Sequence, residues 1–350
     1  MKIKKDDREI KLALLGFGNA GRAFAKMLLL KEEEIRRQFG VKAIVTAIAT
    51  ASKGNLVNSQ GIDLEKALFD LEKQNRFDSK NDFSKMTTMD IVKESDYDVL
   101  VEMTPLNIAT GEPAISHIKG AFARGKHVIT ANKGPIAWAF SELSAMAEKA
   151  GVGFYYETTV MDGTPVFNLV DHTLMLAKVT EVSGILNSTT NFILEELAKG
   201  ADYDDIMERG RKMGFVEADP SMDIEGYDAA AKITALLNVL MDAKITPDKV
   251  DRKGIEDITV KDIQEALKRG KLVKLVCRGW RDEDGNVHAS VKPTEIGKND
   301  LFATVNSTTS VVSITTDLMK KVTVVEHEPE IEQTAYGVFG DMLRVITEQI

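Results

Sequence analysis

The sequence predicts an α/β protein in which an amino-terminal, doubly wound parallel sheet precedes a second, α+β domain. Three observations support this fold class. Short apolar runs alternate with helical patterns over roughly the first 140 residues, which favours parallel strands joined by right-handed crossovers. A glycine-rich turn stands between the first apolar run and the first helical pattern. Beyond Pro135, the strand candidates are spaced as in a mixed or antiparallel sheet.

The first domain is expected to alternate regularly between strands and helices. The first buried strand ends at Gly16, and apolar residues with helical spacing follow it. A polar segment at 58–94, whose clearest helical start is at Asp63, suits a crossover on the face of the sheet. Strands are predicted at 11–15, 41–49, 97–103 and 127–130, and helices at 20–30 and 111–124.

The pattern changes after one more helix, predicted at 141–150. Strands of the second domain are predicted at 152–156, 178–185, 272–280, 287–291 and 310–316. The sequence does not decide which domain the final helix, at 334–348, packs against. We place the dinucleotide-binding domain at 1–137 and the second domain at 138–333, and the family resemblance given below assigns the helix at 334–350 to the first of them.

Composition excludes several classes of protein. The chain has 350 residues, 43% of them hydrophobic and 28% charged, which is enough for two packed domains. Its net charge of -9 and the lack of a basic block argue against nucleic acid and anionic membranes as partners. No apolar run is long enough to span a bilayer, and no secretory signal is recognised. The single cysteine, Cys277, excludes an internal disulfide framework and favours a reducing, cytoplasmic location.

The glycine-rich turn has the pattern G-x-G-x-x-G between a predicted strand and a predicted helix. In this context the pattern is typical of Rossmann-type dinucleotide-binding domains. The first glycine allows a tight turn, the second lets the backbone approach a pyrophosphate, and the third lets helix and strand pack closely. The residues expected to contact the nucleotide are Gly16, Phe17, Gly18, Asn19, Ala20 and Gly21.

The end of the second predicted strand indicates which nicotinamide nucleotide is bound. An NAD site usually carries an acid there, which holds the ribose 2'-hydroxyl. The segment 50–54 contains no carboxylate and one lysine, so Ser52 and Lys53 favour a 2'-phosphate. We therefore expect NADP, with NAD as the alternative if Lys53 is only a solvated loop charge.

The helix predicted at 229–241 is almost wholly apolar, which indicates that it is buried on most sides. Asp228 and Lys232 lie one turn apart on one of its faces. A buried lysine is costly unless it is paired or used, so Lys232 is a candidate for proton exchange with a substrate oxygen. Glu217, Asp223 and Asp228 would suit a substrate that carries an ammonium group. The alternative is an exposed Asp-Lys pair of small energetic value.

Two further candidates follow strands of the first domain. Lys133 comes shortly after the strand at 127–130, and Thr104 follows the strand at 97–103. Ligands of open α/β sheets bind at the carboxyl ends of the strands. Lys133 is therefore expected to hold a substrate carboxylate or carbonyl, and Thr104 to lie near a nicotinamide ring. An ordinary loop lysine and a plain turn are the alternatives.

With these segments identified, the chain resembles the homoserine dehydrogenases over most of its length. The most specific matches are 184–194 and 214–232, and the segments 131–133 and 157–165 fit the same family. The resemblance implies interconversion of aspartate semialdehyde and homoserine with NAD(P), in threonine and methionine biosynthesis, by a homodimer formed through the second domain. It also implies that the final helix returns to the nucleotide domain. By the same resemblance, Lys232, Lys133 and Asp228 serve catalysis, Glu217, Asp223, Ser188 and Thr189 bind the substrate, and Glu157, Val160, Asp162 and Thr164 hold a structural sodium ion, largely through backbone carbonyls.

Three departures from the family pattern leave alternatives open. Asp162 stands where the family usually has a small residue, and Ser188 stands where a glycine is common. The stretch 326–332 replaces a glycine-rich loop with four carboxylates, which would repel a dinucleotide phosphate if they faced it. A paralogous dehydrogenase of another hydroxy acid or amino alcohol, and a non-catalytic nucleotide sensor, are the alternatives. A dehydrogenase that forms an acyl phosphate needs a nucleophilic cysteine, whereas Cys277 is expected in an apolar strand.

Overall fold

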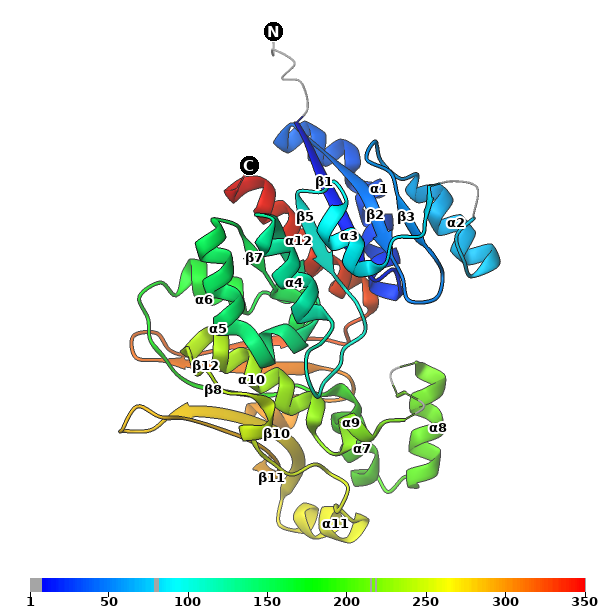
Figure 1. The fold of residues 1–350 in the computed structure, drawn as a ribbon. Coiled ribbons are helices and arrows are strands. Elements are labelled where there is room, and N and C mark those ends of the chain that lie inside the picture. The colour runs from blue at the N-terminus through cyan, green and yellow to red at the C-terminus, as the bar shows by residue number, and fades with distance from the viewer. Residues whose placement is uncertain (1–7, 79–81, 215, 218, 350) are drawn as a thin grey trace. The chain divides into compact units, whose positions relative to one another are not determined.

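The computed structural model describes residues 8–78, 82–214, 216–217 and 219–349 (Figure 1). The chain divides into two compact units, and each is considered by itself below. Unit 1 comprises residues 1–135, 139–164 and 330–350, and unit 2 comprises residues 136–138 and 165–329. Within the described residues, no helix combines the length and the apolar character needed to cross a membrane.

Unit 1 is built on a seven-stranded sheet. Its strands are β1 (Arg8–Leu15), β2 (Val41–Ala49), β3 (Asn55–Val57), β4 (Phe83–Ser84), β5 (Val99–Glu102), β6 (His127–Thr130) and β7 (Phe154–Tyr155). They lie in the order β4-β3-β2-β1-β5-β6-β7. The strands from β2 to β7 in this order are parallel, whereas β3 and β4 pair in antiparallel fashion at one edge. The chain changes direction across the sheet between β1 and β5, which is where open α/β sheets bind their ligands.

Helices of unit 1 follow from recognisable local signals. They are α1 (Asn19–Phe39), α2 (Leu64–Gln74), α3 (Thr88–Glu94), α4 (Ala114–Ala123), α5 (Lys133–Ala150) and α12 (Ile331–Glu348), with a short 3-10 turn η1 (Glu157–Thr159). The predicted helical start at Asp63 is confirmed, because its carboxylate accepts a 2.9 Å hydrogen bond from the Lys66 N–H and caps α2. α1 begins at Asn19, inside the G-x-G-x-x-G motif and one residue before the predicted start at 20.

One local prediction is wrong, and one predicted helix is longer than expected. The segment 152–156 was assigned to the second sheet, but β7 pairs in parallel with β6 in the sheet of unit 1. A strand of two residues carries too little pattern to indicate its partner. The helix predicted at 141–150 is confirmed as the second part of α5, after a kink at Ala139, where φ is -141° and ψ is 17°. A first part that was not predicted begins at Lys133, because the Asn132 side chain accepts from the Gly134 N–H at 3.0 Å and caps it. The predicted domain boundary after residue 137 therefore falls inside α5.

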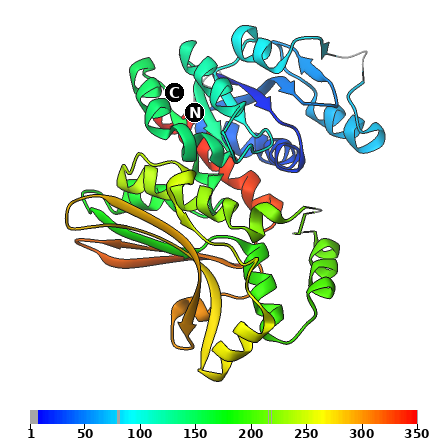
Figure 2. The ribbon, with the colours of Figure 1, turned by 60° about the horizontal axis from the view of Figure 1, so that its bottom comes forward.

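Unit 2 is built on a mixed sheet, whose long strands are visible in Figure 2. The sheet has six strands in the order β13-β12-β8-β10-β11-β9. Its strands are β8 (Val179–Ile185), β9 (Asp251–Arg252), β10 (Lys271–Arg281), β11 (Val287–Gly297), β12 (Ser310–Thr316) and β13 (Lys320–Glu326). Its helices are α6 (Phe167–Thr173), α7 (Ser188–Ala198), α8 (Tyr203–Met213), α9 (Ser221–Ile224), α10 (Tyr227–Met241) and α11 (Val260–Lys268), with 3-10 turns η2 (Pro247–Lys249) and η3 (Leu301–Thr304).

The predicted buried helix is confirmed as α10, which packs on β10. Gly279 of β10 lies so close to α10 that a Cβ on it would come within 2.4 Å of the Leu237 side chain. Cys277, also on β10, is fully buried, and its thiol lies 4.0 Å from the Ala229 carbonyl oxygen. Burial raises the pKa of the Cys277 thiol to about 12, so it is a core residue and not a nucleophile, as predicted.

The final helix, α12, belongs to unit 1, where it packs against α1. Its residues Ala335, Val338 and Met342 are fully buried in the same core as Leu12 of β1. The helix begins at Ile331, before the predicted start at 334, because Glu330 and Gln333 form a reciprocal capping box. Part of the acidic stretch 326–332 is therefore the first turn of a helix, and Glu326 is buried at the end of β13.

Candidate functional site

The glycine-rich turn of unit 1 has the geometry of a nucleotide cradle. Gly16 has a φ of +93°, and a Cβ on it would lie 2.3 Å from the Met103 carbonyl oxygen. A Cβ on Gly21 would lie 2.6 Å from the Gly16 carbonyl oxygen, so α1 approaches β1 as closely as only glycine permits. A Cβ on Gly18 would meet no described atom within 4 Å, and no side chain caps the first turn of α1. Open space beside uncapped N–H groups fits a pyrophosphate.

The remaining residues of the turn differ in how they face this space. Phe17 is 2% exposed, and its ring packs against Phe77 with centroids 6.0 Å apart. Its side chain thus belongs to the core, which leaves only its backbone for a nucleotide. Asn19 is exposed and accepts a 2.7 Å hydrogen bond from Arg22, while Ala20 is half-buried.

A pocket of about 320 Å³ lies beyond the end of β2. Ser52 and Lys53, both predicted, line it together with Arg76, which sequence reasoning missed. The turn is held by Thr50, whose hydroxyl donates to the Gly54 carbonyl at 2.7 Å and accepts from the Lys53 N–H at 2.9 Å. Arg76 carries no local signal, because β3 and α2 separate it from Lys53 and only folding returns it to this turn. Two cations therefore line one small pocket.

The carboxyl ends of β5 and β6 carry a buried polar network. The Glu102 carboxylate accepts from the N–H and hydroxyl of Thr104, at 2.7 and 2.5 Å, and lies 2.7 Å from His117 Nδ1. Asn132 donates to the Thr104 carbonyl oxygen at 3.2 Å. The Thr104 hydroxyl is therefore engaged with Glu102. Lys133 follows as the first residue of α5, so it stands at a helix N-terminus rather than in a loop.

Lys232 of α10 lies in a polar cluster within unit 2. Its side chain is 19% exposed and its ammonium donates to the Leu186 carbonyl oxygen at 2.7 Å. The Asp228 carboxylate, on a side chain that is 14% exposed, lies 3.4 Å from the same nitrogen. The alternative of an exposed Asp-Lys pair is therefore wrong. A largely buried amine beside a carboxylate is suited to move a proton.

Asn187 joins this cluster and was missed by sequence reasoning. It caps α7, and its side-chain nitrogen donates to Asp223 at 2.6 Å and to Asp228 at 3.0 Å. Burial, followed by the nearby Asp228 charge, raises the pKa of Asp223. The available signal was an asparagine two residues after a strand and directly before a helix, which marks an N-cap but does not indicate its contacts with the two aspartates.

The predicted substrate residues are only partly brought together. Thr189 is 3% exposed and hydrogen-bonds Asp223, and Ser188 is the half-buried first residue of α7. Glu217 is exposed and stands between residues 215 and 218, which lie outside the described residues. The predicted stretch 214–232 is thus described only in part, and the role of Glu217 stays a prediction.

The segment expected to bind sodium runs through η1. Glu157 and Val160 are 5% and 4% exposed, and Asp162, at a φ of +43°, accepts a 2.5 Å hydrogen bond from the Thr334 hydroxyl. Asp341 accepts from the Glu157 N–H at 3.0 Å, while its Oδ1 is buried without a hydrogen-bond partner. Burial raises the pKa of Asp341 to about 8. Across the described residues, no cluster of three or more His, Cys, Asp or Glu side chains is arranged to hold a metal.

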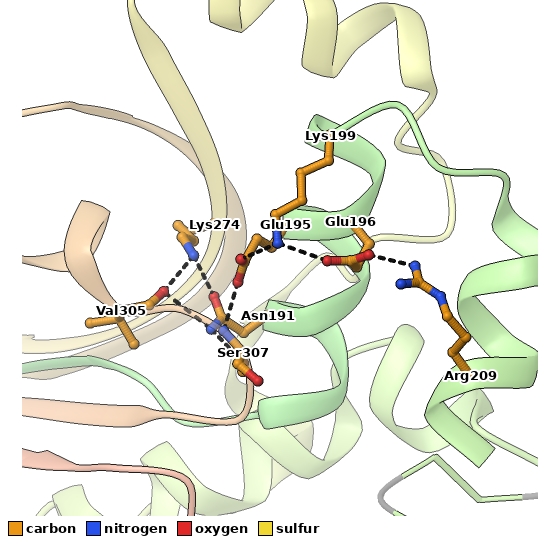
Figure 3. Close-up of polar contacts among 8 residues, drawn as sticks. All are labelled: Asn191, Glu195, Glu196, Lys199, Arg209, Lys274, Val305 and Ser307. Atoms are coloured by element: carbon orange, nitrogen blue, oxygen red, sulfur yellow. Dashed lines mark hydrogen bonds and ion pairs between the residues drawn. The ribbon is translucent and has the colours of Figure 1, made fainter. Parts of the chain in front are cut away.

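A second buried lysine of unit 2 contacts α7 through Asn191 (Figure 3). Lys274 of β10 is 3% exposed, and its ammonium donates to Asn191 Oδ1 at 2.7 Å and to the Val305 carbonyl at 2.6 Å. Asn191 in turn donates to the Ser307 carbonyl at 2.9 Å, and Glu195 accepts from the Ser307 N–H at 2.6 Å. Burial lowers the pKa of Lys274 to about 8. Sequence reasoning missed this lysine, because it lies inside an ordinary strand pattern.

Comparison with known proteins agrees with these features. The sequence pattern of the family described as homoserine dehydrogenase matches residues 165–343, and that of the homoserine dehydrogenase NAD-binding domain matches residues 16–157. A homoserine dehydrogenase of Methanocaldococcus jannaschii is 36% identical, over 95% of this chain and 98% of that protein. An NAD(+)-dependent homoserine dehydrogenase of Pseudomonas canavaninivorans is 33% identical, over 96% of each.

One solved structure is similar to this chain over nearly its whole length. It is a hyperthermophilic archaeal homoserine dehydrogenase in complex with NADPH, which superposes with a TM-score of 0.83 at 26% identity and covers 98% of this chain and 99% of its own. Because the similarity to these proteins covers nearly the whole of both chains, it is not limited to the nucleotide-binding domain. This chain therefore belongs to the homoserine dehydrogenase family of NAD(P)-dependent oxidoreductases.

Proposed function

We propose that this chain interconverts L-aspartate 4-semialdehyde and L-homoserine, with NADP as the preferred cofactor and Lys232 as the proton-transferring group. The observation that carries the proposal is the cluster of Lys232, Asp228 and Asp223 beside α7, in a chain of this family. When bound, the nucleotide supplies or accepts the hydride. The side chains of the protein bind the substrate and transfer the proton.

Lys232 would deliver a proton to the aldehyde oxygen during reduction and remove it from the alcohol during oxidation. Its bond to the Leu186 carbonyl fixes the ammonium, and Asp228 at 3.4 Å stabilises the charged form. Lys133 would hold a substrate carboxylate or carbonyl. Asp223 and Asp228 would bind the substrate ammonium, with Ser188, Thr189 and Glu217 completing that site.

A direct assay tests the reaction. Purified protein is incubated with homoserine and NADP, and formation of NADPH is followed by absorbance at alkaline pH, where oxidation is favoured by proton release. A panel of other hydroxy acids and amino alcohols serves as the control. Activity on any of these far above the activity on homoserine would contradict the proposed substrate.

The preference for NADP is supported by the pocket beyond β2, which is lined by Lys53 and Arg76. Asp78 also lines it, but one of its carboxylate oxygens lies 3.6 Å from the Lys66 ammonium. Two cations suit a 2'-phosphate. We expect Arg76→Ala to weaken NADPH binding about 10-fold and NADH binding little, since one charge-assisted contact is lost. Fluorescence titration measures both constants, with Lys26→Ala as the control, and equal weakening for both nucleotides would contradict the role of Arg76.

The sodium site proposed at Glu157, Val160, Asp162 and Thr164 is supported by the orphaned Oδ1 of Asp341 beside Glu157. Such an acceptor fits either a nearby cation or a proton on Asp341 itself. Thermal unfolding in NaCl and in choline chloride at equal ionic strength separates the two. A sodium site predicts a higher melting temperature in NaCl, and identical melting curves would reject it.

A homodimer through unit 2 is supported by apolar side chains that this unit exposes. Four of them are 58% to 95% exposed: Met175, Leu176, Leu318 and Met319. The two segments are joined by Lys178 and Asp317, whose backbone groups hydrogen-bond at 3.1 Å. Clusters of this kind mark association surfaces. Analytical ultracentrifugation should find a dimer for the wild type and a monomer for Leu176→Glu; a wild-type monomer would contradict the proposal. The cytoplasmic location suggested by the lone cysteine is part of the same proposal.

A further inference from the structure

The Asn187 side chain uses all of its hydrogen-bonding capacity at one point of unit 2. Its Oδ1 accepts from the Thr190 N–H and from the Thr190 hydroxyl, each at 2.9 Å. Its Nδ2 donates to Asp223 at 2.6 Å and to Asp228 at 3.0 Å. A primary amide has two acceptor positions and two donor hydrogens, so no capacity is left over. The Thr190 N–H fixes the orientation, because it requires the oxygen on the helix side.

This arrangement gives Asn187 a task that neither aspartate can perform alone. Two carboxylates on one amide nitrogen are held with their bonded oxygens roughly 5 Å apart, given the angle between the two N–H bonds. Without the amide, their charges would repel and the side chains would separate. Asn187 is itself 5% exposed and anchored to α7, so it is a rigid support.

We propose that Asn187 is a positioning residue that holds Asp223 and Asp228 as a two-carboxylate site for the substrate ammonium. This inference rests on the proposed function and adds to it the source of selectivity for an amino acid substrate. An ammonium group donates three hydrogen bonds and carries one charge, which matches two fixed carboxylates. Lys232 has its own hydrogen bond to the Leu186 carbonyl in addition to its ion pair with Asp228, so loss of the Asn187 amide leaves the ammonium one direct anchor.

The test compares homoserine with 4-hydroxybutanoate, which has the same alcohol and carboxylate but no ammonium. Asn187→Asp keeps the oxygen that caps α7 and removes both N–H donors. Asn187→Ser keeps a capping oxygen without adding a charge, and it serves if the aspartate variant does not fold. In both variants the ratio of kcat/KM for homoserine to that for 4-hydroxybutanoate should fall about 10- to 100-fold, mainly through the KM for homoserine.

Thr190→Val is the matched control, because it removes one bond to the Asn187 oxygen and leaves both carboxylate contacts in place. It should lower the melting temperature without changing the substrate ratio. An unchanged ratio in Asn187→Asp and Asn187→Ser, in a wild type that prefers homoserine, would overturn this inference alone. A wild type that does not turn over homoserine would instead overturn the proposed function.

Discussion

Two lysines of unit 2, Lys232 and Lys274, differ in what surrounds them. Lys232 is 19% exposed and stands 3.4 Å from a carboxylate, whereas Lys274 is 3% exposed and donates to an amide oxygen and a backbone carbonyl. Burial alone therefore does not identify a reactive lysine. Lys274 is the more deeply buried of the two, but its hydrogen bonds connect structural elements of the unit. Two properties distinguish Lys232, the proposed catalytic group, from Lys274, the structural one. The side chain of Lys232 is partly accessible, and it is paired with a carboxylate.

The largest effect should come from Lys232→Ala. Loss of a proton-transfer group typically reduces turnover by about two to four orders of magnitude. Steady-state kinetics measures this, and circular dichroism with nucleotide titration checks that fold and cofactor binding survive. Lys199→Ala, at an exposed ion pair on α7, is the control and should keep turnover. Unchanged turnover in well-folded Lys232→Ala would erase the distinction between the two lysines.

The next effect concerns Lys274 and the free energy of unfolding. The folded pKa of Lys274 is about 8 and its unfolded value is 10.5, so the unfolded chain binds more protons between these pH values. Stability should therefore rise with pH across this window, and the cost of about 3 kcal/mol is fully present below about pH 8.

Urea unfolding at pH 7.5 and pH 10 measures this contribution as a difference between the wild type and Lys274→Met. The difference in unfolding free energy should move in favour of the wild type by about 2 to 3 kcal/mol on going to pH 10. The exposed Lys26→Met corrects for lysine titration in the unfolded chain. A difference that stays constant with pH would mean that Lys274 is not desolvated in solution.

Asp223→Asn should have a smaller effect than loss of Lys232. It removes one negative charge from the proposed ammonium site and keeps a similar shape, so the KM for homoserine should rise about 10-fold, with a smaller change in kcat. Kinetics with 4-hydroxybutanoate provides the internal control, because that substrate carries no ammonium. If both substrates lose equally, Asp223 has a general structural role like that of the Lys274 network.

The smallest effect should come from Arg209→Ala on α8. Arg209 pairs with Glu196 at the outer edge of the Lys274 network, where its side chain is 49% exposed (Figure 3). Partly exposed pairs contribute about 0 to 1 kcal/mol. The melting temperature should fall by at most a few degrees with unchanged turnover. A fall in melting temperature as large as that of Lys274→Met would show that the Arg209–Glu196 pair and the buried Lys274 contacts stabilise the fold as one unit.

The sequence by itself determined the features that depend on local pattern. The glycine turn between β1 and α1, the cap at Asp63 and the apolar helix that carries Asp228 and Lys232 all follow from residues close together in the chain. Such signals are readable because turn geometry, capping and helical spacing act over a few residues. The family resemblance added the reaction and its cofactor class, and the comparisons support both.

Only the tertiary structure decided which distant residues meet. It placed β7 beside β6, returned α12 to the core of unit 1 and brought Arg76 to the pocket of Lys53. It also joined Asn187 to Asp223 and Asp228, and buried Lys274 in contact with Asn191 of α7. No local pattern encodes these contacts, because each depends on how whole strands and helices pack, and the chemistry of a side chain is set by the neighbours that packing supplies.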